Sequence, residues 1–202
     1  GGFETFGSAY TIQGVDLNSS YAFTQTATTF ENLSGGLAES ESVTFRAIIT
    51  DLAGNSTTGS TSSTTISVDQ TAPNVNYVTS TQVDGLYSTG DELPIIIFMS
   101  DTATVTGTPQ LTLETGDSDE VVDFTSGSGS SVLVFTYTVA AGNNSSDLDY
   151  SSTSALALNG GAINDTAGNP FTLTLATPGE ANSLGANKAI VVDTACLLYT
   201  SD

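Results

Sequence analysis

The amino-acid sequence predicts an all-β protein made of two antiparallel β-sandwiches in tandem. Apolar and polar residues alternate with a period of two along most of the chain, and clusters of glycine, asparagine and serine separate the alternating segments. The composition agrees, because 20 of the 202 residues are glycine, 38% are apolar and only 12% are charged. A pair of motifs that occurs twice in the same order indicates that one module is repeated.

The alternation predicts individual strands in order along the chain. Residues 42–50 carry an apolar side chain at every second position, as expected of a half-buried strand. Residues 93–99 are apolar on both faces and predict a central strand, with Pro94 at its start because proline cannot donate within a sheet. In residues 131–139 the predicted inward face consists of Leu133, Phe135, Tyr137 and Val139. Shorter alternations occur at 66–68, 111–113 and 171–175, and no segment has a convincing helical period.

The repeated motif is an Asp-x-Ala-Gly-Asn turn followed by a Val-Asp-x-Thr segment. The turn occupies residues 51–55 and 165–169, and the later segment begins at Val68 and at Val192. We interpret each copy as the final hairpin of a sandwich, which places a module boundary at 70–73, where Pro73 stiffens the linker.

The boundary divides the chain into three parts. Residues 1–72 form a first module that lacks its N-terminal strands, and residues 73–195 form a second, complete module of eight or nine strands. Residues 196–202 break the pattern and resemble a translated sequencing adapter, so we exclude them from the fold. The alternative is a genuine C-terminal strand. We expect both ends to be cuts through a longer protein, in which case the missing signal peptide is uninformative about secretion.

Charge and residue content exclude several classes of function. With 22 acidic and 2 basic residues, the net charge of −20 repels nucleic acid and anionic membranes, and it attracts cations such as calcium. The chain has no histidine and one cysteine, which excludes a His/Cys zinc site, a Ser-His-Asp triad and an internal disulfide. No apolar run reaches the ~18 residues of a membrane span.

The motifs resemble the tandem bacterial immunoglobulin-like repeats of large surface adhesins. Besides the turn and the Val-Asp-x-Thr segment, the second module has Asp84-Gly85-Leu86-Tyr87, Gly90-Asp91-Glu92-Leu93, residues 106–111 and Leu148-Asp149-Tyr150 in the order seen in such a repeat. The resemblance covers nearly all of residues 42–195. It implies immunoglobulin-like sandwiches in an extracellular, repeat-built stalk that calcium often stiffens, and it implies no catalysis.

Carboxylates are the predicted calcium ligands, because calcium prefers hard oxygen donors. Immunoglobulin-like topology gathers one set at the junction of the modules: Asp69, Asp101, Asp165, Asn169, Glu39 and Glu41. A second set lies at the exit of module two and includes Asp84, Asp91 and Asp193. Two alternatives need no metal. The acids can be solvated groups that keep the protein soluble, and each turn aspartate can accept backbone N–H bonds while its glycine takes a positive φ.

Other candidate sites are weaker. The loop at 116–123 has Asp-x-Asp spacing but lacks the glycine and glutamate of an EF-hand, so we expect a solvated hairpin loop. Threonines at alternate positions, as in 102–106, suggest ice or carbohydrate binding or simply the polar face of a strand. Asp147 and Asp149 could indicate glycoside hydrolysis, but no aromatic platform accompanies them and tryptophan is absent.

These observations predict a structural protein rather than an enzyme. We expect a spacer in a secreted or surface-anchored bacterial adhesin, located outside the cell, whose partners are neighbouring modules and, for the full-length protein, a host cell or glycan. The alternatives are a carbohydrate-, ice- or cell-binding module and an accessory domain of a secreted enzyme.

Overall fold

The computed structural model describes residues 39–195 except 41, 52 and 64, and it divides the chain into two compact units. Unit 1 is Gly1–Gln70 and unit 2 is Thr71–Asp202. The described residues form β-strands and a single four-residue helix, so the all-β prediction is confirmed. No helix among them is long and apolar enough to cross a membrane.

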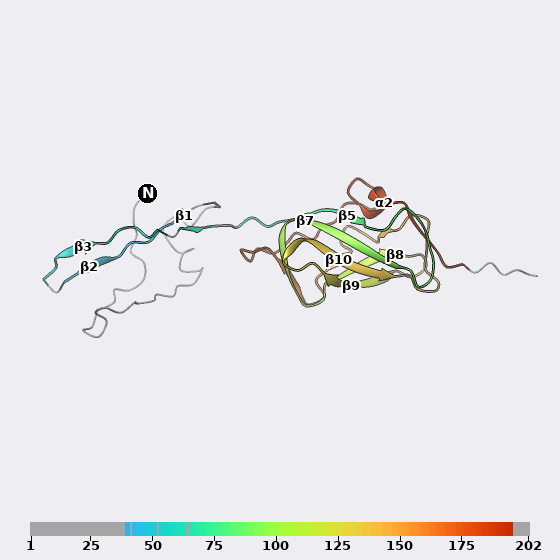
Figure 1. Ribbon diagram of the computed structural model, residues 1–202, viewed down its shortest axis with the longest axis horizontal. Helices are drawn as coiled ribbons and strands as arrows, with labels where there is room; N and C mark the ends of the chain where they lie inside the picture. The colour runs from blue at the N-terminus through green and yellow to red at the C-terminus, as the bar shows by residue number, and fades with distance from the viewer. Residues whose placement is uncertain (1–38, 41, 52, 64, 196–202) are drawn as a thin grey trace, which may run out of the picture. The chain divides into compact units, whose positions relative to one another are not determined.

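The described part of unit 1 is an antiparallel two-stranded ribbon (Figure 1). Strand β1 (Ser42–Val43) pairs with β4 (Ile66–Ser67), and β2 (Ile48–Thr50) pairs with β3 (Ser56–Thr58). Between these pairs, Ser62 N donates to Phe45 O and Gly59 N donates to Ala47 O, which continues the ribbon through less regular backbone. The strand predicted at 42–50 is therefore present but interrupted. Residues 1–38 lie outside the described part, and a first sandwich stays a prediction.

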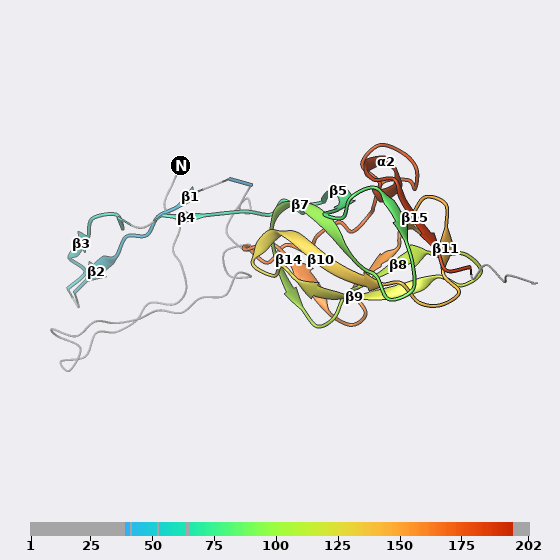
Figure 2. The same cartoon turned by 45° about the vertical axis from the view of Figure 1, so that its right-hand side comes forward.

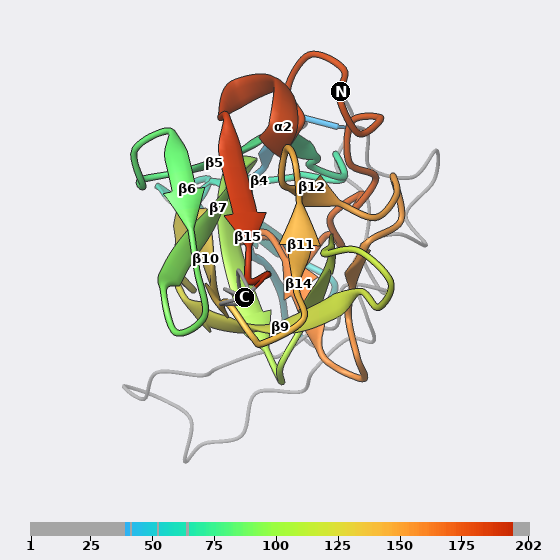
Figure 3. The ribbon, with the colours of Figure 1, turned by 90° about the vertical axis from the view of Figure 1, so that its right-hand side faces the viewer.

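Unit 2 is a β-sandwich built from one large and one small sheet (Figures 1 and 3). The large sheet consists of β5 (Val75–Ser80), β7 (Glu92–Thr106), β10 (Ser130–Thr138), β9 (Glu120–Ser126) and β8 (Gln110–Glu114) in that spatial order, with β12 (Asp149–Tyr150) and β13 (Leu156–Ala157) beside β8 and β14 (Ala162–Asn164) beside the end of β7. The small sheet consists of β11 (Asn144–Ser145), β15 (Ile190–Asp193) and β6 (Gly85–Tyr87). All of these pairs are antiparallel except that of β6 and β15, which is parallel.

Strand β7 is an interior strand of the large sheet, as its sequence predicts. It lies between β5 and β10, and its alternate side chains Leu93, Ile95 and Ile97 are fully buried. Pro94 is only the third residue of the strand, where a missing N–H interrupts the ladder least.

The core of unit 2 packs between the two sheets around aromatic side chains. Phe135 and Tyr137 of β10 are buried together with Tyr150 of β12, which confirms the predicted inward face of residues 131–139. The Phe135 ring contacts that of Phe124 edge to face, with centroids 5.9 Å apart, a favourable aromatic arrangement.

Two features of unit 2 differ from the prediction. It contains two-residue strands such as β11 and β12, which are too short to show a period. It also contains one helical turn, α2 (Leu184–Asn187), whose N-cap Ser183 accepts a 3.1 Å hydrogen bond from Ala186 N. Four residues are too few for a helical pattern, so only the capping serine signals this turn in the sequence.

The repeated motif continues differently in the two units. After the turn of unit 1, one ribbon strand leads directly to the Val-Asp-x-Thr segment. In unit 2, Phe171 N donates to Ile163 O and so returns the chain along β14, but a loop with α2 then carries it to β15 in the small sheet. The prediction that both motifs close one hairpin is therefore wrong for unit 2, where Val192 lies on a third strand.

The two ends of unit 2 lie at opposite ends of its sandwich. Residues 71–74 join the end that carries the turn at 165–169, because Thr172 N donates to Pro73 O and Ser100 N donates to Asn74 O. Residues 193–195 leave from the other end, beside β11 (Figures 1 and 2). A chain entering unit 2 therefore leaves it on the far side.

Candidate functional site

The turn of unit 2 is organised around the buried carboxylate of Asp165. Its Oδ1 accepts hydrogen bonds from the backbone N–H groups of Ala167, Gly168 and Asn169 at 2.9, 2.7 and 2.8 Å, and its Oδ2 accepts one from Asn169 Nδ2 at 2.9 Å. Asp165 is only 4% exposed, and Gly168 has a φ of +99°, which a residue with a side chain rarely adopts. The motif thus specifies a turn in which residues of the turn itself donate hydrogen bonds to both oxygens of the aspartate.

The turn of unit 1 makes the same pattern of bonds in an exposed setting. Asp51 Oδ1 accepts from Ala53 N and Asn55 N at 2.9 and 2.8 Å, and its Oδ2 accepts from Asn55 Nδ2 at 2.9 Å. Gly54 has a φ of +88°. The two copies of the motif therefore build one local structure in both units.

The hydrogen bonds hold both turn aspartates in their charged form. Burial by itself raises the pKa of Asp165, but the bonds from Asn169, Gly168 and Ala167 outweigh it and leave the pKa below the ordinary 3.8. The side-chain bond from Asn55 is the main cause of the lowered pKa of Asp51. N–H donors thus engage both oxygens of Asp165, and these bonds account for the conformation of the turn without a metal ion.

Asp101 lies at the same end of unit 2 as this turn. The antiparallel register pairs Asn164 with Thr104, so Asp165 follows β14 beside the part of β7 that holds Asp101. Asp101 is exposed, and its Oδ1 accepts a 2.6 Å hydrogen bond from Thr102 N. The structure thus places three of the predicted junction residues, Asp101, Asp165 and Asn169, near the N-terminal end of unit 2.

The remaining predicted junction residues belong to unit 1. Glu39 is exposed, and its carboxylate accepts a hydrogen bond from Gln70 N. Asp69 is exposed too. Glu41 lies outside the described residues.

The three predicted exit residues have separate local roles. Asp84 forms a 3.1 Å ion pair with Lys188, whereas Asp91 accepts a bond from Ser88 N and Asp193 accepts one from Ala195 N, both at 2.8 Å. Since Gly85 pairs with Ile190, Asp84 lies beside the start of β15 and Asp193 forms its end, roughly 10 Å further along at ~3.3 Å per residue. These two carboxylates are therefore not brought together.

Asp147 and Asp149, which are also expected near the exit of module two, lie beside the same residue of α2. A Cβ atom on Gly185 of α2 would lie 2.9 Å from Asp149 Oδ2 and 3.4 Å from Asp147 Oδ2, so both carboxylates approach the helix backbone. Asp149 is buried and accepts bonds from Tyr150 N and Gly179 N, each at 2.9 Å. Burial, and then the charge of Asp149, raise the pKa of Asp147.

A buried polar network just after the C-terminal end of β10 gives a structural role to the threonine of the Val-Asp-x-Thr segment. Asn143 Oδ1 accepts bonds from Tyr137 OH and Ala140 N, both at 2.8 Å. The Thr194 hydroxyl donates to Asn143 O and accepts from Gly142 N, both at 2.9 Å. Burial, together with a nearby glutamate charge, raises the pKa of Tyr137 to about 12. Sequence reasoning missed this role of Thr194, although its recurrence within the motif was a signal.

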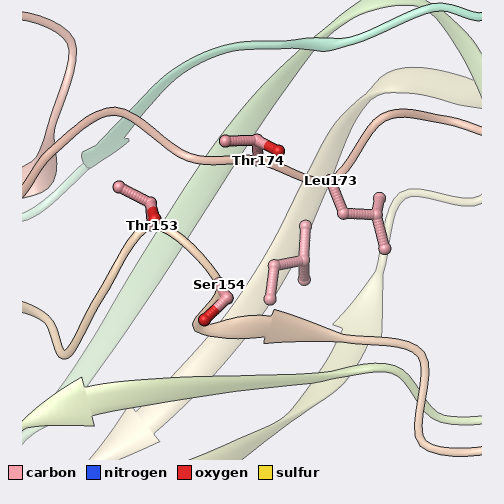
Figure 4. Close-up of a pocket in the computed structure, with 5 residues that line it drawn as sticks. Thr153, Ser154, Leu173 and Thr174 are labelled. Atoms are coloured by element: carbon pink, nitrogen blue, oxygen red, sulfur yellow. The ribbon is translucent and has the colours of Figure 1, made fainter.

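The described part of unit 2 also has a shallow pocket of ≈ 230 Å³ (Figure 4). Its lining consists of Thr153, Ser154, Leu156, Leu173 and Thr174. Hydroxyl and aliphatic groups can hold a small polar molecule, but none of them is a general acid or base near neutral pH.

A hairpin loop connects β8 and β9, as predicted, but it spans residues 115–119, and the rest of the predicted loop, residues 120–123, begins strand β9. Asp117, Asp119 and Asp123 are exposed, and Gly116 has a φ of +105°. Within the described residues, no three or more histidine, cysteine, aspartate or glutamate side chains form a group that could hold a metal ion.

Compared with known protein families, with curated proteins and with solved structures, the chain shows no significant match.

Proposed function

We propose that the chain is a structural spacer of a secreted or surface-anchored bacterial protein. In such a spacer the chain enters each unit at one end and leaves it at the opposite end. The observation that carries this proposal is the position of residues 71–74 and 193–195 at opposite ends of the unit 2 sandwich. A module with this geometry adds its own length to a tandem chain, whereas one with neighbouring termini adds little.

The local chemistry supports the same function. The turn carboxylates Asp51 and Asp165 are engaged by their own backbone, and the pocket at Thr153 and Thr174 carries no titratable group. The net charge of −20 keeps an extracellular protein soluble and discourages contacts between copies.

Scattering from tandem copies tests the proposal. Residues 1–195 are joined in one, two and three copies, and small-angle scattering measures the maximum dimension of each protein. A spacer adds a similar length with every copy. Copies that collapse on one another, with little increase in maximum dimension, would contradict it.

A binding assay tests the rival function. The wild-type protein is applied to a glycan array and to an ice-affinity assay, because the pocket and the threonine-rich strands are its candidate binding surfaces. A Thr153→Val, Thr174→Val double variant is the matched control. We expect no binding above background for either protein. Binding by the wild-type chain that the variant loses would replace the spacer with a recognition module.

A further inference from the structure

Strand β7 presents apolar side chains on both of its faces. Leu93, Ile95 and Ile97 belong to the core of unit 2, whereas Ile96 and Phe98 alternate with them and lie on the other face of the sheet. Those two side chains are half-buried, and they neither belong to the core nor pack against it. Strands that are apolar on both faces are typical of sheets that are covered on both sides. The sequence of β7 therefore indicates that the outward face of the large sheet is a contact surface.

The two neighbouring strands extend this outward face. The register places Tyr77 of β5 and Val132 of β10 directly beside Phe98. It places Thr79 of β5 and Val134 of β10 directly beside Ile96. Paired residues of adjacent strands share a face, and the Tyr77 and Phe98 rings stack with their centroids 4.5 Å apart. We call the surface formed by these two rows the outer patch: Tyr77, Thr79, Ile96, Phe98, Val132 and Val134, all of them half-buried.

The outer patch carries no charge, although the chain is strongly acidic. None of its residues is an acid or a base, whereas the chain has 22 acidic residues. The nearest acids along β7 are Glu92, its first residue, and Asp101, which lies beyond Phe98 toward the other end of the strand. Aromatic residues without charges are typical of the centre of a protein interface, and polar or charged residues are typical of its rim.

The net charge of the chain decides which kind of partner fits the outer patch. A basic protein would be attracted to the acids elsewhere on the surface and would gain least at an uncharged face. An acidic protein is repelled wherever those acids lie, so its approach is least costly at the outer patch. A second copy of this chain has the required negative charge, and it presents the same apolar surface in return.

We propose that the outer patch is the contact through which two copies of this chain associate, with their large sheets face to face. A two-fold arrangement sets each patch against its counterpart, about 10 Å away as in packed sheets. Three strands ~4.8 Å apart give a patch of roughly 200–300 Å² per copy, well below the ~800 Å² per partner of a stable complex. The association is therefore weak and reversible, with a dissociation constant on the order of 1 mM, and it goes beyond the spacer function by joining spacers that lie side by side.

Sedimentation equilibrium of the full chain tests this contact. Cys196→Ser is the common background, because it excludes a disulfide-linked dimer. Between ~10 μM and ~1 mM we expect the average mass to rise from that of the monomer toward twice that value. Val134→Glu places a like charge at the centre of the contact and should weaken association at least ~10-fold. Thr79→Glu should act in the same direction without removing an apolar side chain, and circular dichroism checks that both variants are folded.

Leu86→Glu is the matched control. It makes the same change of charge at an apolar side chain that is 68% exposed, but Leu86 lies on β6 of the small sheet. This variant should associate as the wild-type chain does. Raising the salt concentration from ~0.05 to ~0.5 M should strengthen wild-type association, because salt screens the repulsion between acidic chains and the outer patch has no ion pair to weaken.

Three results would overturn the proposal. The first is a wild-type chain that stays monomeric at ~1 mM in high salt. The second is wild-type association in both Val134→Glu and Thr79→Glu, and the third is its loss in Leu86→Glu, which would place the contact on the small sheet. None of these results bears on the spacer function, because the length added by each tandem copy is measured at ~10 μM, where chains do not associate.

Discussion

Asp165 and Asp51 make similar local hydrogen bonds in different surroundings, and we expect the surroundings to determine what these bonds contribute to stability. Asp165 is buried beneath the turn, although the residues that donate to it are exposed or half-buried, so its removal leaves a space inside unit 2 as well as three lost hydrogen bonds. Asp51 is exposed, so water can replace its carboxylate.

Replacing Asp165 with alanine should therefore destabilise unit 2 by about 2 kcal/mol, as expected when charge-assisted hydrogen bonds to a buried carboxylate are lost. Asp51→Ala, the matched change in unit 1, should have a smaller effect. Denaturant unfolding at pH 7 measures both. Equal losses would show that burial does not control the contribution of the turn.

The pH dependence of the Asp165 contribution follows from its lowered pKa. A carboxylate with a lowered pKa stabilises the folded state above its ordinary value of 3.8, and this contribution is lost as the pH falls through the folded-state pKa. The difference in unfolding free energy between wild type and Asp165→Asn should thus shrink below about pH 4. A difference that stays constant down to pH 2 would contradict the assignment.

Asp147 should show the opposite sign, because burial and Asp149 raise its pKa. The charged form of Asp147 destabilises the folded state at neutral pH, and this penalty disappears as the pH falls through the raised pKa. Asp147→Asn should therefore stabilise unit 2 at pH 7, by less than about 1 kcal/mol for a partly exposed group, and give no gain in acid. Thermal unfolding of the wild-type chain and of Asp147→Asn at pH 7 and pH 3 measures this difference. A variant that is less stable than wild type at pH 7 would contradict the prediction.

At the scale of the element, strand β10 carries the clearest division between a buried and a solvated face. Phe135 is fully buried against Phe124, whereas Thr136 lies on the other face and its backbone N–H bonds to Thr125 Oγ1. Phe135→Ala should cost roughly 3–5 kcal/mol, and Thr136→Ala about 1 kcal/mol or less. Unfolding free energies measured on both variants check this, and similar values would mean that the faces are assigned wrongly.

The long strands could be predicted from the sequence because a period of two repeats several times in each. Strand β10 is of this kind, and its buried residues match the prediction, whereas β7 was predictable because its first half is apolar on both faces. The turns at 51–55 and 165–169 were predictable because Asp, Gly and Asn have specific conformational roles. The calcium ligands proposed from the same residues stay a prediction, since carboxylate content alone does not reveal which oxygens the backbone already engages.

The pairing of β6 with β15 could not be predicted in the same way. Each strand has only three or four residues, and nothing local indicates that residues near 86 and 191 meet in parallel. The approach of Asp147 and Asp149 to Gly185 depends on a loop that a single helical turn positions, and that turn is too short to have a period. Contacts of this kind depend on tertiary structure, which strand periodicity does not encode.

At the scale of the whole molecule, an excess of 20 negative charges makes calcium the ligand to test first. Extracellular modules bind calcium with a dissociation constant of ~0.1–1 mM, so ~10 mM calcium should stabilise a site by roughly 1.4–2.7 kcal/mol. Asp69→Asn and Asp101→Asn should each lose that gain. Asp165→Asn should lower stability equally with and without calcium, because its role is in the turn.

Differential scanning calorimetry in calcium and in chelator, at matched ionic strength, measures this gain. If the wild-type chain unfolds at the same temperature in calcium and in chelator, calcium does not stabilise this protein. The turns and the spacer geometry do not depend on calcium.

The local closure of the two DxAGN turns also has a consequence for how the chain folds. Their bonds span only five residues, so they form with little loop-closure entropy, before distant strands such as β6 and β15 meet. In a chain of similar units, a hairpin that closes early pairs each strand with its own neighbour and not with its counterpart in the next unit, the error to which repeated domains are prone. We therefore expect Asp165→Ala to lower the refolding rate constant by nearly the same factor as the folding equilibrium constant. Stopped-flow refolding can measure this rate constant.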